Sequence, residues 1–488
     1  MNISDIKKII TVSIIFFLNS FSLSYSSPWA NVGDIALRND VEIIARYGLI
    51  SGPVNNWPMS WKQITANLYK ADVMELPSYV RMSLARVREK VPAKINVKAK
   101  AYYTSKVDYF SGFEETSRTR AVIESTLELN MEDTSVHVTA SYNDAENFNL
   151  DGSYLSHEFG NISAYVGAVE RWWGPGRETT TLLSTNARPM PSIGLRRVEL
   201  KPFKSKWLSW MGPWSGDIFI SKMDKDRTIS SPIFVGMKLG FEPIRNFEIG
   251  LSRTLMLCGE GRICNFKSWT NGLIAFGDLD NRGPREQQPG NQLAMLDLSY
   301  SFTLKDNMNV KLYAEGTAED IVVAAPYTYS RLIGASFYGP FGTNGSSYRF
   351  TTEYSDTTGS LAWFLGEHRK GVMYNHSLYE TGYRYNNKVI GHTLDSNSKY
   401  ISLKATLHQL NGWQYSLKYQ NVTVNTEGDN KNILSISREN INSLTLNVTV
   451  PTKLGHLLFD GRIMDNEINT PLENKVNIRV GFMWDVGF

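Results

Sequence analysis

The stretch that decides the fold is Asn477-Ile478-Arg479-Val480-Gly481-Phe482-Met483-Trp484-Asp485-Val486-Gly487-Phe488. Every second side chain in it is apolar, whereas the positions between include Asn477, Arg479 and Asp485. Successive side chains of a β-strand point to opposite faces, so one face of this strand is apolar and the other can be hydrated. A final strand of this kind that ends in phenylalanine is typical of bacterial outer-membrane β-barrels. The alternative is a half-buried edge strand of a soluble sheet.

The N-terminal residues predict an exported protein. Lys7 and Lys8 precede an apolar run over residues 9–23, and small residues follow it. This order is typical of a secretory signal peptide, which we place at residues 1–24, with cleavage near Ser26 or Ser27 as the alternative. No later run reaches about 18 consecutive apolar residues, the length that a membrane helix needs. We therefore expect the chain in the bacterial outer membrane.

The composition fits a barrel and argues against other classes of protein. Aromatic residues make up 12% of the chain, and 37 glycines stand beside only 18 prolines. Many strands joined by tight turns, with aromatic girdles, have this balance. The mean hydropathy of −0.28 is low for a helical membrane protein but suits a barrel with a polar interior. Because the net charge is only +3, we expect no nucleic-acid partner, and nothing indicates a cofactor.

The two cysteines, Cys258 and Cys264, enclose a short segment with two glycines. An exported protein meets an oxidising compartment, so we expect a disulfide between them, with free thiols as the alternative. No cluster of His or Cys accompanies the pair, and we expect no metal site.

Residues 25–93 show the apolar period of helices. Gly48 is placed to end a first helix, Ser60 with Gln63 makes a capping-box signature for a second, and Pro77 starts a third. The apolar stripes of these helices consist of Leu37, Val41, Ile44, Ile64, Leu68, Val80, Leu84, Val87 and Val91. We expect a small helical bundle on the periplasmic side, capping or plugging the mouth of the barrel.

Residues 94–488 change to a period of two, which predicts the β-barrel itself. Ile401 and Leu403, for example, alternate with Ser402 and Lys404. Outer-membrane barrels join their strands by short periplasmic turns and long extracellular loops. We expect the turns at Glu132-Asp133, Gly160-Asn161, Pro243 to Asn246, Lys305 to Asn309, Gly342 to Gly345, Leu410 to Gly412 and Pro451 to Gly455. The long loops are expected at 104–118, 171–191, 258–289, 357–397 and 422–438.

Several of these long segments carry a family resemblance. The blocks are Glu170-Arg171-Trp172-Trp173-Gly174-Pro175-Gly176, Leu183 to Pro191, Pro289 to Ala294, Tyr374 to Ser377, Gly382 to Tyr385 and Ile390 to His392. With Trp29 to Asp34 and the final strand, they make the chain resemble the Wzi family of capsule-assembly outer-membrane proteins. The stretch from Arg177 to Thr181 is rich in threonine, where that family pattern is more apolar. Residues 262–286 also diverge.

The resemblance implies an all-β transmembrane barrel of about 18 antiparallel strands, a number that placing strands between the turns also gives. It implies a surface lectin that binds exported capsular or extracellular polysaccharide and holds it at the cell surface. Outer-membrane lipid and the capsule export machinery are its further expected partners.

Six residues are candidate contacts for polysaccharide: Trp172, Trp173, Arg177, Trp269, Arg282 and Arg285. Aromatic faces stack on the apolar faces of sugar rings, and Arg pairs with uronate carboxylates, often through two hydrogen bonds. A Trp-Trp-Gly-Pro-Gly turn also fits a packed plug in the barrel mouth, and that alternative stays open.

Two other functions compete with a lectin. An eighteen-stranded barrel can enclose an aqueous pore, so a porin or a substrate-specific channel for sugars or other small solutes is the main alternative. A hydrolase is the other, because His376, Ser377, His392 and Asp395 are triad-type residues within one long segment. Sequence proximity does not establish triad geometry, and we expect no enzyme.

Overall fold

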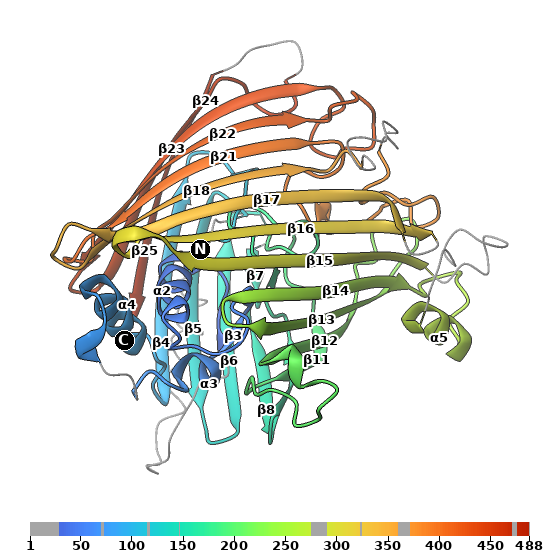
Figure 1. Ribbon diagram of the computed structural model, residues 1–488. Coiled ribbons are helices and arrows are strands. Elements are labelled where there is room, and N and C mark those ends of the chain that lie inside the picture. Colours follow the sequence, from blue (N-terminus) through green and yellow to red (C-terminus); the bar gives the residue numbers. More distant parts are fainter. Residues whose placement is uncertain are drawn as a thin grey trace, which may run out of the picture.

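The strands of the computed structural model join edge to edge into one closed antiparallel barrel (Figure 1). The structure describes residues 29–69, 73–114, 118–145, 147–274, 290–322, 325–359, 371–470 and 476–487. The predicted signal peptide, Arg282, Arg285 and Phe488 lie outside these residues. Within them, β7 and β8 both pair with β6 and together form one interrupted strand of the wall. Counted in this way, the barrel of the described residues has eighteen strands. The predicted fold class and the strand number are confirmed.

The barrel strands follow one another around the wall in sequence order, and the last strand, β25, pairs with the first, β4. They are β4 (Ile95–Thr104), β5 (Ala121–Asn130), β6 (Thr134–Asn143), β7 (Asn147–Asn149), β8 (Tyr154–Phe159), β9 (Ile162–Gly167), β11 (Ser192–Arg197), β12 (Trp214–Lys222), β13 (Ile233–Ile244), β14 (Phe247–Leu257), β15 (Gly290–Thr303), β16 (Asn309–Val322), β17 (Ala325–Phe341), β18 (Ser346–Asp356), β21 (Lys399–His408), β22 (Gln414–Val424), β23 (Glu439–Thr452), β24 (Gly455–Met464) and β25 (Asn477–Gly487).

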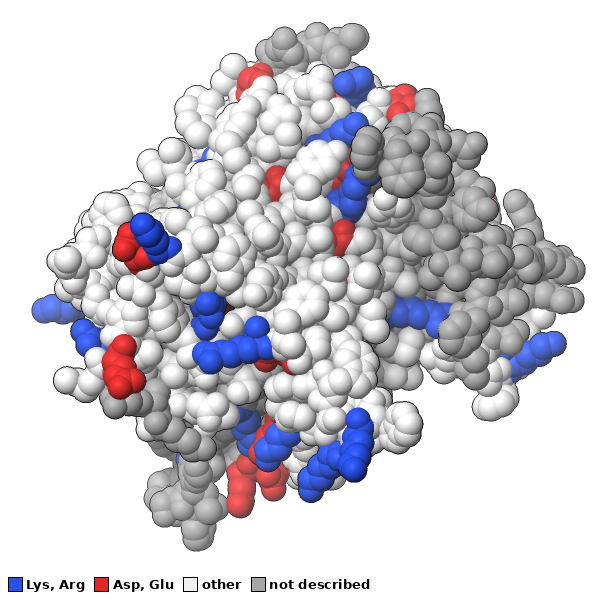
Figure 2. All heavy atoms as spheres, viewed as in Figure 1, with Lys and Arg blue, Asp and Glu red and all other residues white. Residues whose placement is uncertain are grey.

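The two faces of the wall differ as the alternation predicts. In β25, Ile478 and Val480 are 60% and 58% exposed, whereas Asn477 and Arg479 are buried. Outward apolar side chains are what a lipid-facing surface requires, and inward polar ones can pair inside the lumen. Much of the wall that faces the viewer in Figure 2 carries uncharged side chains.

The two ends of the barrel also differ. The predicted turns, from Glu132-Asp133 to Pro451–Gly455, all join strands at one end, which we call the helical end. The opposite, long-loop end carries the connections 105–120, 168–191, 258–289, 357–398 and 425–438. One connection at the helical end was not predicted as a long one: residues 198–213 join β11 to β12 and contain a short 3₁₀ turn, Ser209–Met211.

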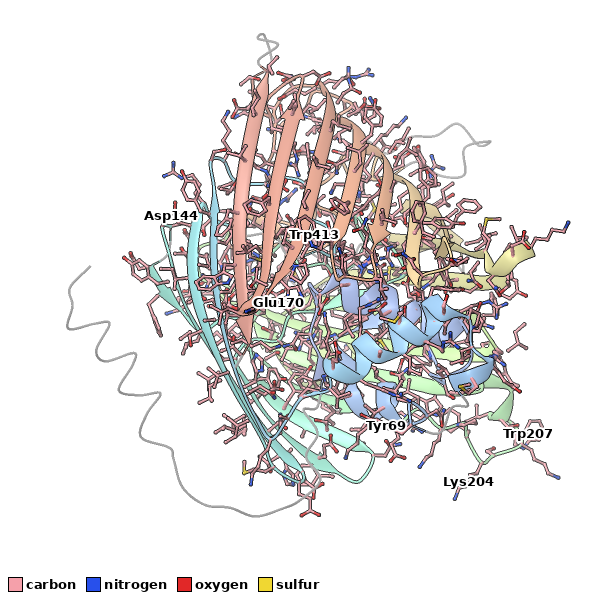
Figure 3. The ribbon with its side chains drawn as sticks, turned by 90° about the vertical axis from the view of Figure 1, so that its left-hand side faces the viewer. Tyr69, Asp144, Glu170, Lys204, Trp207 and Trp413 are labelled. Atoms are coloured by element: carbon pink, nitrogen blue, oxygen red, sulfur yellow. A yellow bond between two sulfur atoms is a disulfide. The ribbon has the colours of Figure 1, made fainter. Side chains whose placement is uncertain are left out.

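The helices of residues 35–89 precede the barrel in sequence and lie at the end that carries the short turns. They are α2 (Ile35–Arg46), α3 (Trp61–Thr65) and α4 (Ser78–Glu89), with a 3₁₀ turn at Val73–Glu75. Figure 3, seen from their side, shows them across the opening of the ring of strands. None of the helices in the described part of the chain is both long and apolar enough to span a membrane.

Helix α2 is buried on every side, from Leu37 to Ile44. A helix that packs only against neighbouring helices would bury one stripe of side chains and expose the rest. Because α2 is buried all round, we infer that the helical segment is inserted into the end of the barrel. The predicted capping box is wrong. Ser60 makes no side-chain cap, and Gln63 instead donates to the carbonyl oxygens of Ser51 and Pro53.

The predicted disulfide between Cys258 and Cys264 is present. It closes a small loop directly after β14, ahead of helix α5 (Phe266–Ile274). Among the described residues no group of His, Cys, Asp and Glu is placed to hold a metal ion.

Candidate functional site

The segment 168–191 turns inward from the long-loop end and meets the N-terminal segment inside the barrel. Trp172 and Trp173 form strand β10, which pairs antiparallel with β2 (Asn56–Trp57). Both tryptophan side chains are fully buried. The indole N–H of Trp172 donates to the carbonyl oxygen of Gly176 at 2.8 Å, which tightens the turn around Pro175. This segment, residues 168–191, is called the plug below.

Two glutamates of the inner wall hold the backbone of the plug. Glu315 of β16 accepts hydrogen bonds from the backbone N–H groups of Gly176 at 3.0 Å and Thr181 at 2.9 Å. Glu353 of β18 accepts from the backbone N–H of Arg177 at 2.6 Å and of Glu178 at 3.0 Å. All of these atoms are buried, where an unpaired N–H or carboxylate oxygen would be costly. The wall therefore fixes the plug by its main chain.

The threonine-rich stretch from Arg177 to Thr181 helps to hold the plug to the wall. The hydroxyls of Thr180 and Thr181 donate to Glu315 at 3.0 and 3.1 Å. Apolar residues in these places would leave that buried carboxylate with fewer donors.

A buried ion network lies where the plug meets α2. Glu42 is surrounded by four cationic side chains, with nitrogen–oxygen distances of 2.7 Å to Arg177, 2.9 Å to Arg349, 3.3 Å to Lys311 and 3.4 Å to Arg38. Burial alone would raise the pKa of Glu42, but these cations outweigh it and hold the pKa well below its usual range. Glu42 of α2 is therefore the central anion where the plug meets this helix.

A second anion, Glu178, binds Lys418 at 3.0 Å and Lys404 at 3.4 Å. Burial would raise the pKa of Glu178, but the two lysines overcome this and lower it from 4.5 to about 2. The wall strands β21 and β22 thus hold the plug by charge as well as by hydrogen bonds.

Acid is expected to weaken the plug through Glu178. A carboxylate whose folded pKa is depressed contributes stability that is complete above its unfolded pKa and is lost as the pH falls through the folded value. For Glu178 that window runs from about pH 4.5 down to about pH 2. The unfolding temperature measured against pH should fall in this window, and less steeply in Glu178→Gln. An equal slope in the variant would contradict the assignment.

The segment 371–398 also folds inward and interlocks with the plug. The Tyr374 hydroxyl donates to the carbonyl oxygen of Thr181 at 2.5 Å, and the Ser184 hydroxyl donates to that of Gly391 at 2.6 Å. Arg384 binds both carboxylate oxygens of Asp395, with Nη2 at 2.8 Å from each. The lumen is thereby filled by two long-loop segments and the helical segment.

The triad-type residues do not assemble into a catalytic site. The Nδ1 atom of His392 accepts from the backbone N–H of Leu394 at 3.1 Å, so its Nε2 carries the proton and donates to the Ser355 hydroxyl at 2.6 Å. A ring in that tautomer cannot take a proton from the serine. His376 accepts backbone N–H groups of its own turn, and Asp395 is bound to Arg384.

The structure describes four of the six predicted sugar contacts, and these four lie in two different regions. Trp172, Trp173 and Arg177 are buried in the plug, and this burial argues against direct contact with a sugar, because no ring face is open. Trp269 of α5 packs against an apolar cluster that includes Val235 and Leu255 of β13 and β14. Arg282 and Arg285 are outside the described residues.

A small pocket at the long-loop end brings together an aromatic ring, a lysine and several polar groups. It is lined by Tyr109, Asn186, Lys388, Val389, Thr393, Asp395, Ile433 and Leu434. The Tyr109 ring is 38% exposed, and the Lys388 ammonium lies 5.6 Å from its centroid. Lys388 stands on the hairpin of β19 (Arg384–Tyr385) and β20 (Lys388–Val389). Burial, with a smaller contribution from Arg118, lowers the pKa of Lys388.

Sequence reasoning missed this pocket because its members come from four separate connections. Tyr109, Asn186, Lys388 and Ile433 are brought together only by the interlocked loops. An aromatic ring can stack on an apolar ring face, and an ammonium group beside it can pair with an anion of the same ligand.

A closed barrel with an apolar outer wall and a lumen filled by its own loops defines the class: a plugged outer-membrane β-barrel. Within that class the chain belongs to the capsule assembly protein Wzi family, whose sequence model matches residues 86–470. The family resemblance is therefore confirmed. This is a family of capsule assembly proteins, not of enzymes.

Individual proteins are similar to this chain to different degrees. A protein of Klebsiella pneumoniae, described as an uncharacterized 55.8 kDa protein in the cps region, is 30% identical over 299 residues, which are 59% of this chain and 58% of the relative. The match thus spans less than two thirds of that relative's length. The structure of Escherichia coli Wzi, described as an outer membrane protein involved in group 1 capsule assembly and a carbohydrate binding β-barrel, superposes with a TM-score of 0.79. It is 23% identical, and the match covers 93% of this chain and 98% of that one. OprD of Pseudomonas aeruginosa is 9% identical with a TM-score of 0.44, over 81% of this chain and 95% of its own.

Proposed function

We propose that this barrel binds exported capsular polysaccharide at the cell surface and helps to attach and assemble the capsule there, without catalysing a reaction. Residues 25–93 would face the periplasm, and the barrel of residues 94–488 would present its long-loop end outside. The observation that carries the proposal is the lumen, which is filled by interlocked loops held by the wall. Such a barrel offers polymer a binding surface at its mouth rather than a path through it.

The surface at the long-loop end fits a polymer of acidic sugars. The pocket around Tyr109 and Lys388 supplies a stacking face and a cation, and Asn186 and Thr393 line it with polar groups. A repeating polymer can engage many copies of the barrel at once, so each site can be weak while the chain stays attached. The capsule export machinery would be the source of the polymer.

The direct test is the division of polysaccharide between the cell surface and the medium in cells with and without this protein. We expect polymer to shift into the medium on deletion, with total synthesis unchanged. Complementation with the wild-type gene should restore the division. An unchanged division would remove the attachment role, and steady single-channel conductance of the purified barrel would then favour a channel.

Lys388→Gln is expected to lower the affinity for a uronate-containing polysaccharide about tenfold, because a charge-assisted hydrogen bond contributes about 1.5 kcal/mol. Calorimetric titration of the purified barrel with the polymer measures this. The matched control is Lys225→Gln, which removes an exposed lysine in another connection at the same end. If Lys388→Gln and the wild type bind the acidic polymer with equal affinity, the acidic sugar binds elsewhere. If Lys388→Gln also loses affinity for a neutral polymer, the substitution has disturbed the fold.

A further inference from the structure

The connection 198–213 at the helical end, called the basic loop here, has a composition unlike that of the short turns around it. It contains Lys201, Lys204 and Lys206, all exposed, within a sequence that continues Trp207-Leu208-Ser209-Trp210. Glu199 is its only acidic residue. In Figure 3 the labelled Lys204 and Trp207 project beyond the outline of the barrel wall, away from the helices.

The basic loop is folded onto the outer surface of the wall. The Phe203 ring stacks on Trp214, with centroids 4.6 Å apart and planes 11° apart. Trp214 is the first residue of β12 and has the same parity as the exposed Ile218 and Ile220, so it faces outward. On the neighbouring strand its partner in register is Phe241, which therefore also faces outward.

A second aromatic contact fixes the other end of the loop to the same surface. The Trp210 ring meets Phe241 edge to face at 5.8 Å. The guanidinium of Arg197 lies 3.8 Å from the Trp214 ring centroid and donates to the carbonyl oxygens of Glu199 and Lys201, both at 3.0 Å. The loop is thus an ordered extension of the apolar outer wall.

Beyond these contacts the loop leaves large apolar groups uncovered. Trp207 is 87% exposed, Trp210 59% and Leu208 42%. Tryptophan beside lysine is the combination found where a protein meets the headgroup layer of a membrane, because the ring sits at the boundary and the ammonium reaches phosphate. Because the loop packs on outward-facing residues of the lipid-facing wall, we infer that its exposed apolar side chains also contact lipid.

We propose that the basic loop binds anionic phospholipid headgroups of the membrane leaflet at the helical end of the barrel. Trp207 and Leu208 enter the boundary between headgroups and acyl chains, and Lys204 and Lys206 bind the phosphates around them. Lys201, which is ion-paired with Glu199, adds to the positive charge of the loop. This role goes beyond glycan binding and does not depend on it, because it concerns the opposite end of the barrel.

The test uses the full barrel reconstituted in vesicles with brominated phosphatidylglycerol or brominated phosphatidylcholine, both of which quench nearby tryptophan. The chain has 12 tryptophans, so the signal of Trp207 is taken as the difference between the wild type and Trp207→Phe. We expect that signal to be quenched by both lipids, and at least about twofold more by phosphatidylglycerol at equal mole fraction. Raising the salt concentration should reduce the preference.

The triple variant Lys201→Gln/Lys204→Gln/Lys206→Gln should lose the preference for phosphatidylglycerol while Trp207 stays quenched. The matched control, Lys225→Gln/Lys267→Gln/Lys431→Gln, removes three exposed lysines from the long-loop end and should keep the preference. Equal quenching by the two lipids in the wild type would overturn the headgroup assignment. A Trp207 that neither lipid quenches would place the loop in water and overturn the proposal as a whole.

Discussion

Glu42→Gln is expected to lower the free energy of unfolding by about 3–5 kcal/mol, because it leaves buried cations without their central anion. Glutamine has nearly the volume of glutamate, so the loss is one of charge and not of packing. Arg177 and Arg349, which lie 2.7 and 2.9 Å from the Glu42 carboxylate, would then meet a neutral amide in its place. Thermal unfolding of the purified barrel in detergent measures the effect.

The matched control is Glu89→Gln, which removes an exposed carboxylate from α4 and should change the unfolding temperature little. A double variant, Glu42→Gln with Arg177→Gln, should recover part of the loss, since it removes one of the uncompensated charges. A Glu42→Gln barrel as stable as the wild type would show that the network does not hold the plug.

Glu315→Ala with Glu353→Ala is expected to release the plug and open the lumen. The pair of glutamates accepts four backbone N–H groups of residues 176–181. Each buried N–H left without an acceptor costs about 1–3 kcal/mol, so the variant loses on the order of 5 kcal/mol or more of plug stability. Single-channel recording should show conductance steps in the double variant and none in the wild type.

A second readout separates plug release from loss of the fold. Thr180→Cys, at a fully buried position, should stay unlabelled by a thiol reagent in the wild-type background and become labelled with the alanine pair. Glu315→Gln with Glu353→Gln keeps an acceptor oxygen in each place and should give an intermediate result. A double-alanine barrel that neither conducts nor labels would refute the idea that these carboxylates hold the plug.

The barrel could be predicted from sequence because its cause is local. The alternation of Ile478 and Val480 with Asn477 and Arg479 is set by the two-residue period of a strand, whatever the rest of the chain does. The short turns could also be predicted, because local turn residues such as Gly160-Asn161 mark them. The connection 198–213 was missed at the helical end because its length breaks the rule of short turns there.

The interior could not be predicted, because it depends on contacts between distant parts of the chain. Trp172 was proposed as a sugar contact, yet it pairs with Trp57, more than a hundred residues away. Glu42 stands out in no local pattern, since its four cations come from α2, the plug and two wall strands. The packing of Trp269 could have been predicted from sequence, because Phe266, Trp269 and Leu273 are spaced as one face of a helix. In the structure, Trp269 packs from that helix against an apolar cluster of wall residues.

The interlocked interior also gives the barrel a mechanical property. Arg38 of α2 donates to the carbonyl oxygens of Pro175 and Gly176, and Tyr374 donates to that of Thr181. A force applied to the long loops by a polymer under shear would pass along this chain of bonds and spread into the surrounding strands. No single loop would bear the load alone, because each long-loop segment is hydrogen-bonded to another part of the interior.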